Sequence, residues 1–233
     1  MAYIELKNVC KTYEDEETDI KVLKKLNFEI EKGQLVVIVG PSCSGKTTFL
    51  NVLGGLDEIT SGKIIINKID ISKLKERKLA KYRRENIGFA FQTCNLIENL
   101  TVKENVELST QISKNPEDSL AILKKVGLSK KIDYLPYELT KEEQYCAAIA
   151  RAIAKKPKIL LCDEAIDNLD NKSKKQILKL LQNYAKKEKM IIVITTCNED
   201  FSSIANQVIT LKNGSIKDLK INKKPISAGD LKW

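Results

Sequence analysis

One stretch near the N-terminus decides the fold: GPSCSGKTT, residues 40–48. It follows the apolar run LVVIV at 35–39 and leads into a helix-like pattern at 47–53. Glycines at both ends of the loop let the backbone wrap around a phosphate chain, so that N–H groups and the N-terminus of the next helix face anionic oxygens. A full GxxxxGK[ST] pattern in this context predicts a phosphate-binding P-loop rather than an ordinary glycine turn.

The side chains of this loop predict how a nucleotide is held. Lys46 is expected to reach the β- and γ-phosphates, and the Thr47 hydroxyl is expected to coordinate Mg²⁺. Cys43 is interpreted as a tolerated thiol, with a redox-sensitive thiol beside Lys46 as the alternative. The candidate nucleotide-binding residues of the loop are Gly40, Pro41, Ser42, Cys43, Ser44, Gly45, Lys46, Thr47 and Thr48.

Composition narrows the class of protein. A length of 233 residues suits one large domain, or a domain with a subdomain. Six scattered cysteines without a CxxC pair, and no histidine, favour free thiols over a zinc site or a disulfide framework. The net charge of +9 suits an anionic partner, but the lysines are spread along the chain, so nucleic-acid binding is not expected. Without a signal pattern or a long apolar run, we expect a cytoplasmic protein.

Apolar, β-prone runs alternate with helix-like stretches, which predicts an α/β fold with a parallel core sheet. We expect a single domain over residues 1–233, with a core of 1–95 and 155–214, a helical subdomain at about 96–154 and a basic, irregular tail at 215–233. The expected strands are 3–9, 35–39, 63–66, 87–91, 159–162, 191–195 and 208–211, and the expected helices are 47–53, 119–126, 141–154 and 172–188.

Two acids follow a buried strand in the second half of the chain. The run ILLC at 159–162 is followed by Asp163 and Glu164, at the edge where α/β sheets bind ligands. Asp163 is expected to hold Mg²⁺, and Glu164 to accept a proton from the attacking water or to orient it. Alone, such a pair is often turn or helix-cap chemistry, but a P-loop upstream favours the functional interpretation.

With these motifs, the chain resembles the nucleotide-binding subunit of ABC transporters over roughly residues 2–214. The resemblance rests on the P-loop, on GFAFQ ending at Gln92, and on ARAIAKKPKILLCDEAIDNLD at 150–170. It implies a P-loop NTPase of ABC type, with an antiparallel β subdomain and a helical subdomain beside the parallel sheet. It also implies that Tyr13 stacks on adenine and that Asp170 acts across a dimer. Gln92 is implied to bind Mg²⁺, to sense the γ-phosphate and to take part in catalysis with Lys46 and Glu164. RRENIGFAFQTCNLIENLTVKENVEL is similar to the branch serving lipoprotein release, macrolide export and antimicrobial-peptide resistance.

Two departures from the family pattern bear on catalysis. Where the family has LSGGQ, this chain has LTKEEQ at 139–144, so Lys141 and Glu142 replace glycines that permit close approach to a γ-phosphate. Thr140 can replace the serine hydroxyl. Where the family has a switch histidine, this chain has Thr196, whose hydroxyl is shorter and uncharged. Both changes predict weakened or partner-dependent hydrolysis.

The resemblance implies an ATP-binding subunit, with ATP and Mg²⁺ as ligands, peripheral on the inner face of the membrane and paired with an integral permease. The permease is expected to contact residues 93–100. The subunit is expected to form a homodimer or a heterodimer with another ABC ATPase. An alternative is an ATP-dependent dimerisation switch with little hydrolysis. A soluble nucleic-acid or ribosome-associated ABC protein would usually need two such cassettes, and this chain has one.

Overall fold

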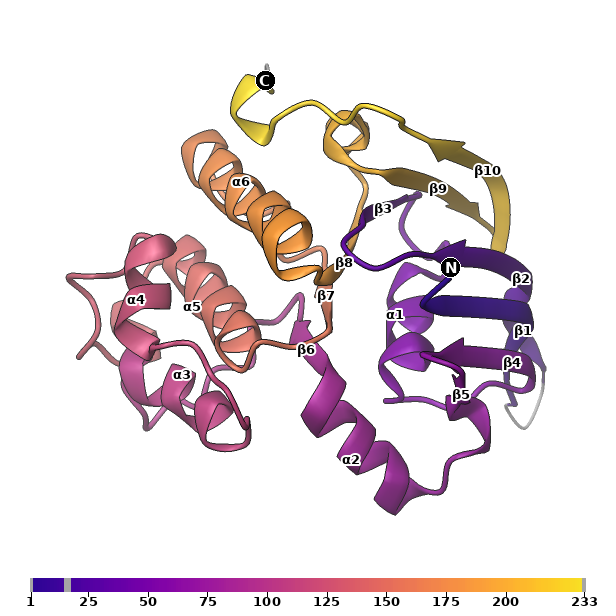
Figure 1. The fold of residues 1–233 in the computed structure, drawn as a ribbon, viewed down its shortest axis with the longest axis horizontal. Coiled ribbons are helices and arrows are strands. Elements are labelled where there is room, and N and C mark those ends of the chain that lie inside the picture. Colours follow the sequence, from indigo (N-terminus) through magenta and orange to yellow (C-terminus); the bar gives the residue numbers. More distant parts are fainter. Residues whose placement is uncertain (1, 15–17, 232–233) are drawn as a thin grey trace.

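A six-stranded sheet forms the centre of the computed structural model, which describes residues 2–14 and 18–231 (Figure 1). The strand order is β10-β9-β3-β8-β7-β6, parallel except for β10, which pairs antiparallel with β9. The predicted parallel core is therefore confirmed. Its strands are β3 (Leu35–Val39), β6 (Ile87–Ala90), β7 (Ile159–Asp163), β8 (Ile191–Thr196), β9 (Gln207–Lys212) and β10 (Ser215–Ile221).

A second sheet is antiparallel and lies beside the first, with the order β2-β1-β4-β5. It consists of β1 (Ile4–Tyr13), β2 (Ile20–Ile30), β4 (Ser61–Ile66) and β5 (Ile69–Asp70). The β2 strand is not among the strands expected from the sequence. Its buried residues are spaced unevenly because Lys25 adopts a positive φ of 50°, which interrupts the alternation by which a strand is recognised.

Helices cover the central sheet on both faces. The α1 helix (Lys46–Gly54) lies between the two sheets, where Phe49 and Leu50 pack with Val36 and Ile38 of β3. The alternate residues of β3, such as Val37, join a separate apolar cluster with the helices of the other face. Those helices are α3 (Val102–Gln111), α4 (Ser119–Lys125), α5 (Lys141–Ala154) and α6 (Asn171–Glu188), and α2 (Glu76–Asn86) leads into β6.

The helical segment between β6 and β7 holds α3, α4 and α5, which Figure 1 shows grouped away from the antiparallel sheet. The α3 helix begins at a capping box in which Thr101 and Glu104 bond to one another's backbone. Four 3₁₀ turns, at Ile71–Lys73, Pro136–Glu138, Glu199–Ile204 and Ala228–Asp230, complete the elements of the described residues.

The expectation of an irregular tail from residue 215 onward is wrong. Residues Ser215–Ile221 form β10 on β9, and Ala228 and Leu231 are buried in the same apolar cluster as α6. The sequence hides this because β10 is an exposed edge strand with few buried side chains. Residues 232–233 of that tail, like residues 1 and 15–17 of the expected domain, lie outside the described residues.

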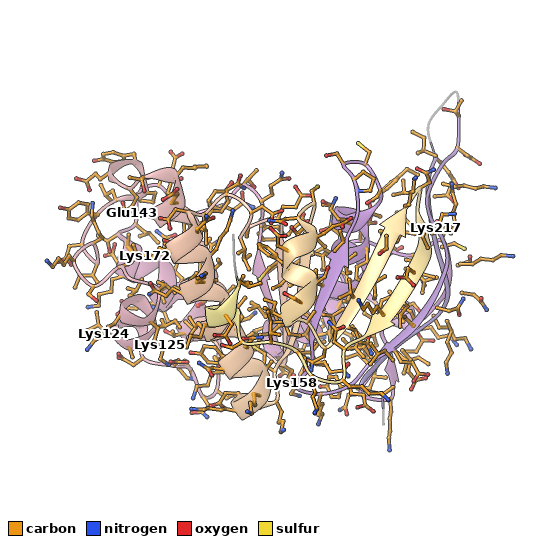
Figure 2. The ribbon with its side chains drawn as sticks, turned by 90° about the horizontal axis from the view of Figure 1, so that it is seen from above. Lys124, Lys125, Glu143, Lys158, Lys172 and Lys217 are labelled. Carbon is orange, nitrogen blue, oxygen red and sulfur yellow. The ribbon has the colours of Figure 1, made fainter. Side chains whose placement is uncertain are left out.

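Positive charge is spread over the molecule. Figure 2 shows Lys124 on α4, Lys158 before β7 and Lys217 on β10 at well-separated places. None of the helices within residues 2–14 and 18–231 combines the length and the apolar character that a membrane crossing requires.

One lysine links stability to pH. Burial lowers the pKa of Lys155 to about 8, and its Nζ donates to the Arg83 carbonyl at 3.2 Å. The unfolded chain, with a lysine pKa of about 10.4, binds more protons than the folded chain between these values. The free energy of unfolding is therefore expected to rise as the pH rises from about 8 to about 10. Urea unfolding of the wild type and of Lys155→Met between these pH values measures this dependence. If the free energy of unfolding changed equally with pH in both proteins, the prediction would be contradicted.

Candidate nucleotide-binding site

The P-loop joins β3 to α1, as its sequence predicts. Gly45 has a φ of 101°, a conformation that side-chain-bearing residues rarely adopt. A Cβ on Gly40 would lie 2.3 Å from the backbone oxygen of Leu211, so only glycine fits there. Gly45 is the N-cap of α1, and no side chain of the described residues caps this helix end. The first N–H groups of α1 are therefore available to an anion at the loop.

The loop residues differ in exposure. Pro41, Ser42 and Cys43 are exposed, whereas Ser44 is 2% exposed. The Ser44 hydroxyl is buried without a hydrogen-bond partner among the described residues and lies beneath the loop beside Gly40. Ser44 contributes structurally through its backbone, since its N–H donates to the Pro41 carbonyl at 3.2 Å.

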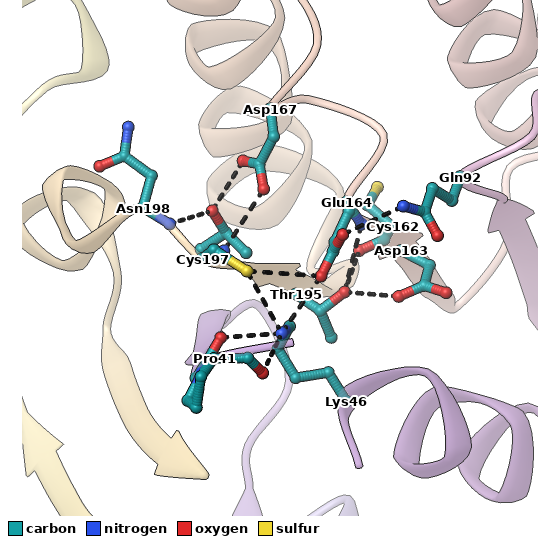
Figure 3. A network of polar contacts seen from close by, with 12 residues as sticks. Pro41, Lys46, Gln92, Cys162, Asp163, Glu164, Asp167, Thr195, Cys197 and Asn198 are labelled. Carbon is teal, nitrogen blue, oxygen red and sulfur yellow. Dashed lines mark hydrogen bonds and ion pairs between the residues drawn. The ribbon is translucent and has the colours of Figure 1, made fainter. Parts of the chain in front are cut away.

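Lys46 is the centre of a polar network (Figure 3). Its ammonium donates to the carbonyls of Gly40 and Pro41 at 2.8 and 2.9 Å, which folds the side chain back over the loop. It also lies 3.1 Å from Oε1 of Glu164 and 3.5 Å from Sγ of Cys197. A buried cation with several acceptors suits the binding of phosphate oxygens, which can take the place of these acceptors.

The predicted acidic pair lies at the carboxyl end of β7, facing Lys46. Burial raises the pKa of Asp163, while hydrogen bonds with Thr195 and Thr47 lower it. The Thr195 hydroxyl donates to the Asp163 carboxylate at 2.8 Å. The contact of Asp163 with Thr47 joins two residues predicted as metal ligands.

Glu164 occupies a strained position. Its φ is 48°, in the left-handed region, and its N–H lies 3.2 Å from both the carbonyl and the hydroxyl oxygen of Thr195. The Gln92 amide donates to Oε2 of Glu164 at 3.2 Å, so the fold brings together Lys46, Gln92 and Glu164, the three predicted catalytic residues. The Tyr145 hydroxyl donates to the Gln92 carbonyl at 2.9 Å, which connects this group to α5.

Tyr13 lies at the end of β1, near the start of α1. Its hydroxyl donates to Asp57 at 2.6 Å, and the Lys11 ammonium lies 4.5 Å from the centre of its ring. The pKa of Tyr13 is raised, chiefly because the side chain is partly buried. Interaction with the Thr48 side chain lowers this pKa in turn. The ring is 39% exposed, so it can offer a face to an adenine base beside the P-loop.

The segment in place of the family signature begins α5. Thr140 is its N-cap, and a capping box joins Thr140 to Glu143 at 3.0 and 3.2 Å. Lys141 is exposed and Glu142 is partly exposed. Lys141 and Glu142 therefore place side chains at the N-terminus of α5, at two positions where the family signature has glycine.

Two residues without a predicted role join this site, Asp167 between β7 and α6 and Cys197 directly after β8. The Thr196 hydroxyl donates to Asp167 at 2.6 Å, and the thiol of Cys197 contacts both Lys46 and Glu164. The sequence placed Thr196 at the switch position but gave no role to Asp167 or Cys197. A third acid four residues after Asp163 is the signal that could have identified Asp167.

Comparison with known proteins places the chain in a family. A family model described as ABC transporter matches residues 23–167. The chain belongs to the ABC transporter ATP-binding family. It is 36% identical to the lipoprotein-releasing system ATP-binding protein LolD of Colwellia psychrerythraea over 221 residues, 93% of this chain and 86% of LolD. The resemblance to the lipoprotein-release branch is thereby confirmed.

A solved member of the ABC family shares the fold. The dimeric structure of the ATP-binding cassette MJ0796, in a post-hydrolysis state bound to ADP and Pi, superposes with a TM-score of 0.89 at 35% identity, covering 95% of this chain and 99% of that one. This confirms the predicted fold class. The putative ABC transporter ATP-binding protein MG065 of Mycoplasma genitalium is 36% identical over 99% of this chain. The matched region spans 50% of the length of MG065.

Proposed function

We propose that this chain is the ATP-binding subunit of an ABC transporter and that it couples the binding and hydrolysis of MgATP to an integral membrane permease. One observation carries the proposal: three residues that lie far apart in the sequence meet beside the P-loop. Glu164 contacts Lys46 at 3.1 Å through one carboxylate oxygen and Gln92 at 3.2 Å through the other. A structural ion pair alone would not need the glycine-built anion cradle beside it.

Residues around Asp163 fit a magnesium ion. The Thr47 hydroxyl lies near enough to the Asp163 carboxylate to lower its pKa, and oxygen ligands of this kind are those that Mg²⁺ prefers. Gln92, which bonds to the neighbouring Glu164, would add an amide oxygen. When bound, Mg²⁺ neutralises charge on the β- and γ-phosphates. Burial of Asp163 disfavours its charged form, so a cation beside it would stabilise the carboxylate.

Glu164 is assigned the role of accepting a proton from the attacking water or orienting it. The carboxylate is held from two sides, by Lys46 on one oxygen and by Gln92 on the other. Fixing both oxygens restricts the direction in which the carboxylate can accept a proton. The Lys46 ammonium would interact with the phosphate chain, and the exposed face of Tyr13 would stack on the adenine.

A dimer would complete the site. In the proposed assembly, the 140–144 segment of one subunit lies against the γ-phosphate bound by the other. The dimeric structure of the MJ0796 cassette, which holds ADP and Pi, supports a dimeric assembly. Lys141 and Glu142 would then stand where close backbone approach is needed, which supports slow or partner-dependent hydrolysis. The same observation favours the second candidate, a dimerisation switch with little turnover.

The permease contact is assigned to residues 93–100, and the subunit to the inner face of the membrane. Ile97 is 46% exposed, an apolar side chain suited to a partner helix. Arg151 of α5 donates to the carbonyls of Cys94 and Asn95 at 2.8 and 2.6 Å, so movement of α5 would reach this segment directly. The similarity to LolD, an ATP-binding protein of a lipoprotein-releasing system, supports a role within a larger transport system.

Nucleotide binding by a Lys46→Ala variant tests the proposal. Removing the ammonium is expected to weaken MgATP binding by at least about tenfold, since one charge-assisted contact contributes about 1.5–3 kcal/mol. Titration with a fluorescent ATP analogue measures the change. Lys21→Ala, at an exposed position on β2, is the control and is expected to bind as the wild type does. Equal affinity in the Lys46 variant would contradict the proposed site.

A further inference from the structure

Thr196 does not face the catalytic group, although it occupies the switch position. Its side chain is 0% exposed, and its hydroxyl donates to Oδ1 of Asp167 at 2.6 Å. The same hydroxyl oxygen accepts from the N–H of Asn198 at 2.8 Å. The Thr196 hydroxyl is thus bonded to Asp167 and to the backbone of Asn198, two residues that Figure 3 labels beside the Lys46 network.

Cys197 is the residue of this segment that reaches the catalytic group. Its thiol accepts from Lys46 at 3.5 Å and donates to Oε1 of Glu164 at 3.7 Å. The backbone N–H of Cys197 lies 3.4 Å from Oδ2 of Asp167. One carboxylate therefore holds both the side chain of Thr196 and the backbone of Cys197.

Asp167 can hold the segment because it is itself fixed. It lies one short turn beyond Glu164, on the segment between β7 and α6, and is half-buried. Burial raises its pKa, whereas the bonds from Thr196 and Cys197 lower it. The Thr196 carbonyl also accepts from the N–H of Gly40 at 3.3 Å, so the strand end is tied to the first residue of the P-loop.

We propose that Asp167 and Thr196 are positioning residues that together hold Cys197 against the Lys46–Glu164 pair, so that the thiol, and not the residue at the switch position, faces the γ-phosphate site. This inference rests on the proposed function. The thiol helps to fix Oε1 of Glu164, and a γ-phosphate bound by Lys46 would lie near the thiol. In this proposal, the segment after β8 senses the bound nucleotide through the thiol of Cys197.

The kinetic test uses Thr196→Val, which removes only the hydroxyl, and Asp167→Asn, which keeps the shape but replaces an acceptor oxygen. Each is expected to lower kcat by about tenfold or more, because small displacements of reacting groups have large effects on rate. The KM for MgATP is expected to change less than twofold to threefold, a range of about 0.6 kcal/mol. Thr196→Ser keeps the hydroxyl and is expected to retain kcat. The double variant is expected to lose no more than the worse single variant, because the two residues act through one contact.

A labelling test does not depend on hydrolysis. Alkylation of Cys197 is followed by peptide mass spectrometry, with and without Mg²⁺ and the β,γ-imido analogue of ATP. We expect the analogue to protect Cys197 in the wild type and in Thr196→Ser, and protection to be lost in Thr196→Val and Asp167→Asn. Asp200→Asn removes an exposed carboxylate from the same segment and is expected to behave as the wild type. Thermal melting identifies any variant that fails to fold.

The outcomes separate this inference from the proposed function. Wild-type kcat and unchanged protection in both Thr196→Val and Asp167→Asn would overturn the inference, provided that Glu164→Gln abolishes hydrolysis in the same preparation. Absence of protection in the wild type would also overturn it. Full hydrolysis by Glu164→Gln would instead contradict the catalytic role of Glu164, on which the proposed function depends.

Discussion

Replacement of Glu164 by glutamine is expected to lower kcat for MgATP hydrolysis by about 10²–10⁴-fold, the range that general acid–base groups contribute. The amide has the shape of the carboxylate and can still contact Gln92, but it can no longer accept a proton from water. Binding of ATP is expected to persist, since the P-loop and Lys46 are unchanged. Phosphate release under steady-state conditions measures the first effect, and a nucleotide titration measures the second.

The matched control is Glu199→Gln, which changes an exposed glutamate in the segment after β8. It is expected to leave both kcat and ATP binding unchanged. Unchanged turnover in Glu164→Gln would remove Glu164 from the catalytic role. Loss of ATP binding in that variant would show that the carboxylate acts in binding instead.

Restoring glycine at both Lys141 and Glu142 is expected to raise kcat of the assembled dimer by about tenfold or more, because one hydrogen-bond donor to a transition state is worth about 10²–10³ in rate. The two glycines remove side chains from the N-terminus of α5 and allow its backbone to approach the opposite γ-phosphate. They are also expected to destabilise the helix by about 1 kcal/mol each. Hydrolysis measured over a range of protein concentrations, with its dimer partner present, reports the gain.

A second variant separates charge from shape. Replacing Lys141 and Glu142 by alanine removes both charges but keeps a Cβ at each position, so it is expected to recover little of the gain. Equal rates for the alanine, glycine and wild-type proteins would show that the altered signature does not limit turnover. A histidine at Thr196 is a poorer restoration, because it would remove the hydroxyl that binds Asp167 in a fully buried position.

The parts of the fold that the sequence predicts are those with strong local patterns. The apolar runs of β3, β7 and β8 are buried on both faces, and the P-loop glycines meet steric limits that no other residue satisfies. The α2 helix and the β10 strand were missed because each buries few side chains and so shows little periodicity.

The residues of the candidate site also fall into those that a local motif identifies and those that only the tertiary structure brings together. Lys46, Asp163 and Glu164 stand in motifs whose spacing alone identifies them. The contact of Asp167 with Thr196 joins positions 29 residues apart, and it depends on the parallel pairing of β7 with β8. No local pattern encodes which side chain of the 196–198 segment turns toward Lys46. For that reason, the sequence points to the switch position but not to Cys197.

Steady-state hydrolysis of MgATP by the purified chain, with Lys46→Ala and Glu164→Gln measured alongside, tests the central claim most directly. The proposed function predicts phosphate release by the wild type that is abolished in both variants, with ATP binding retained in Glu164→Gln and weakened in Lys46→Ala. Turnover that persists at the wild-type rate in both variants would contradict the assignment of this site as the one that binds and hydrolyses ATP.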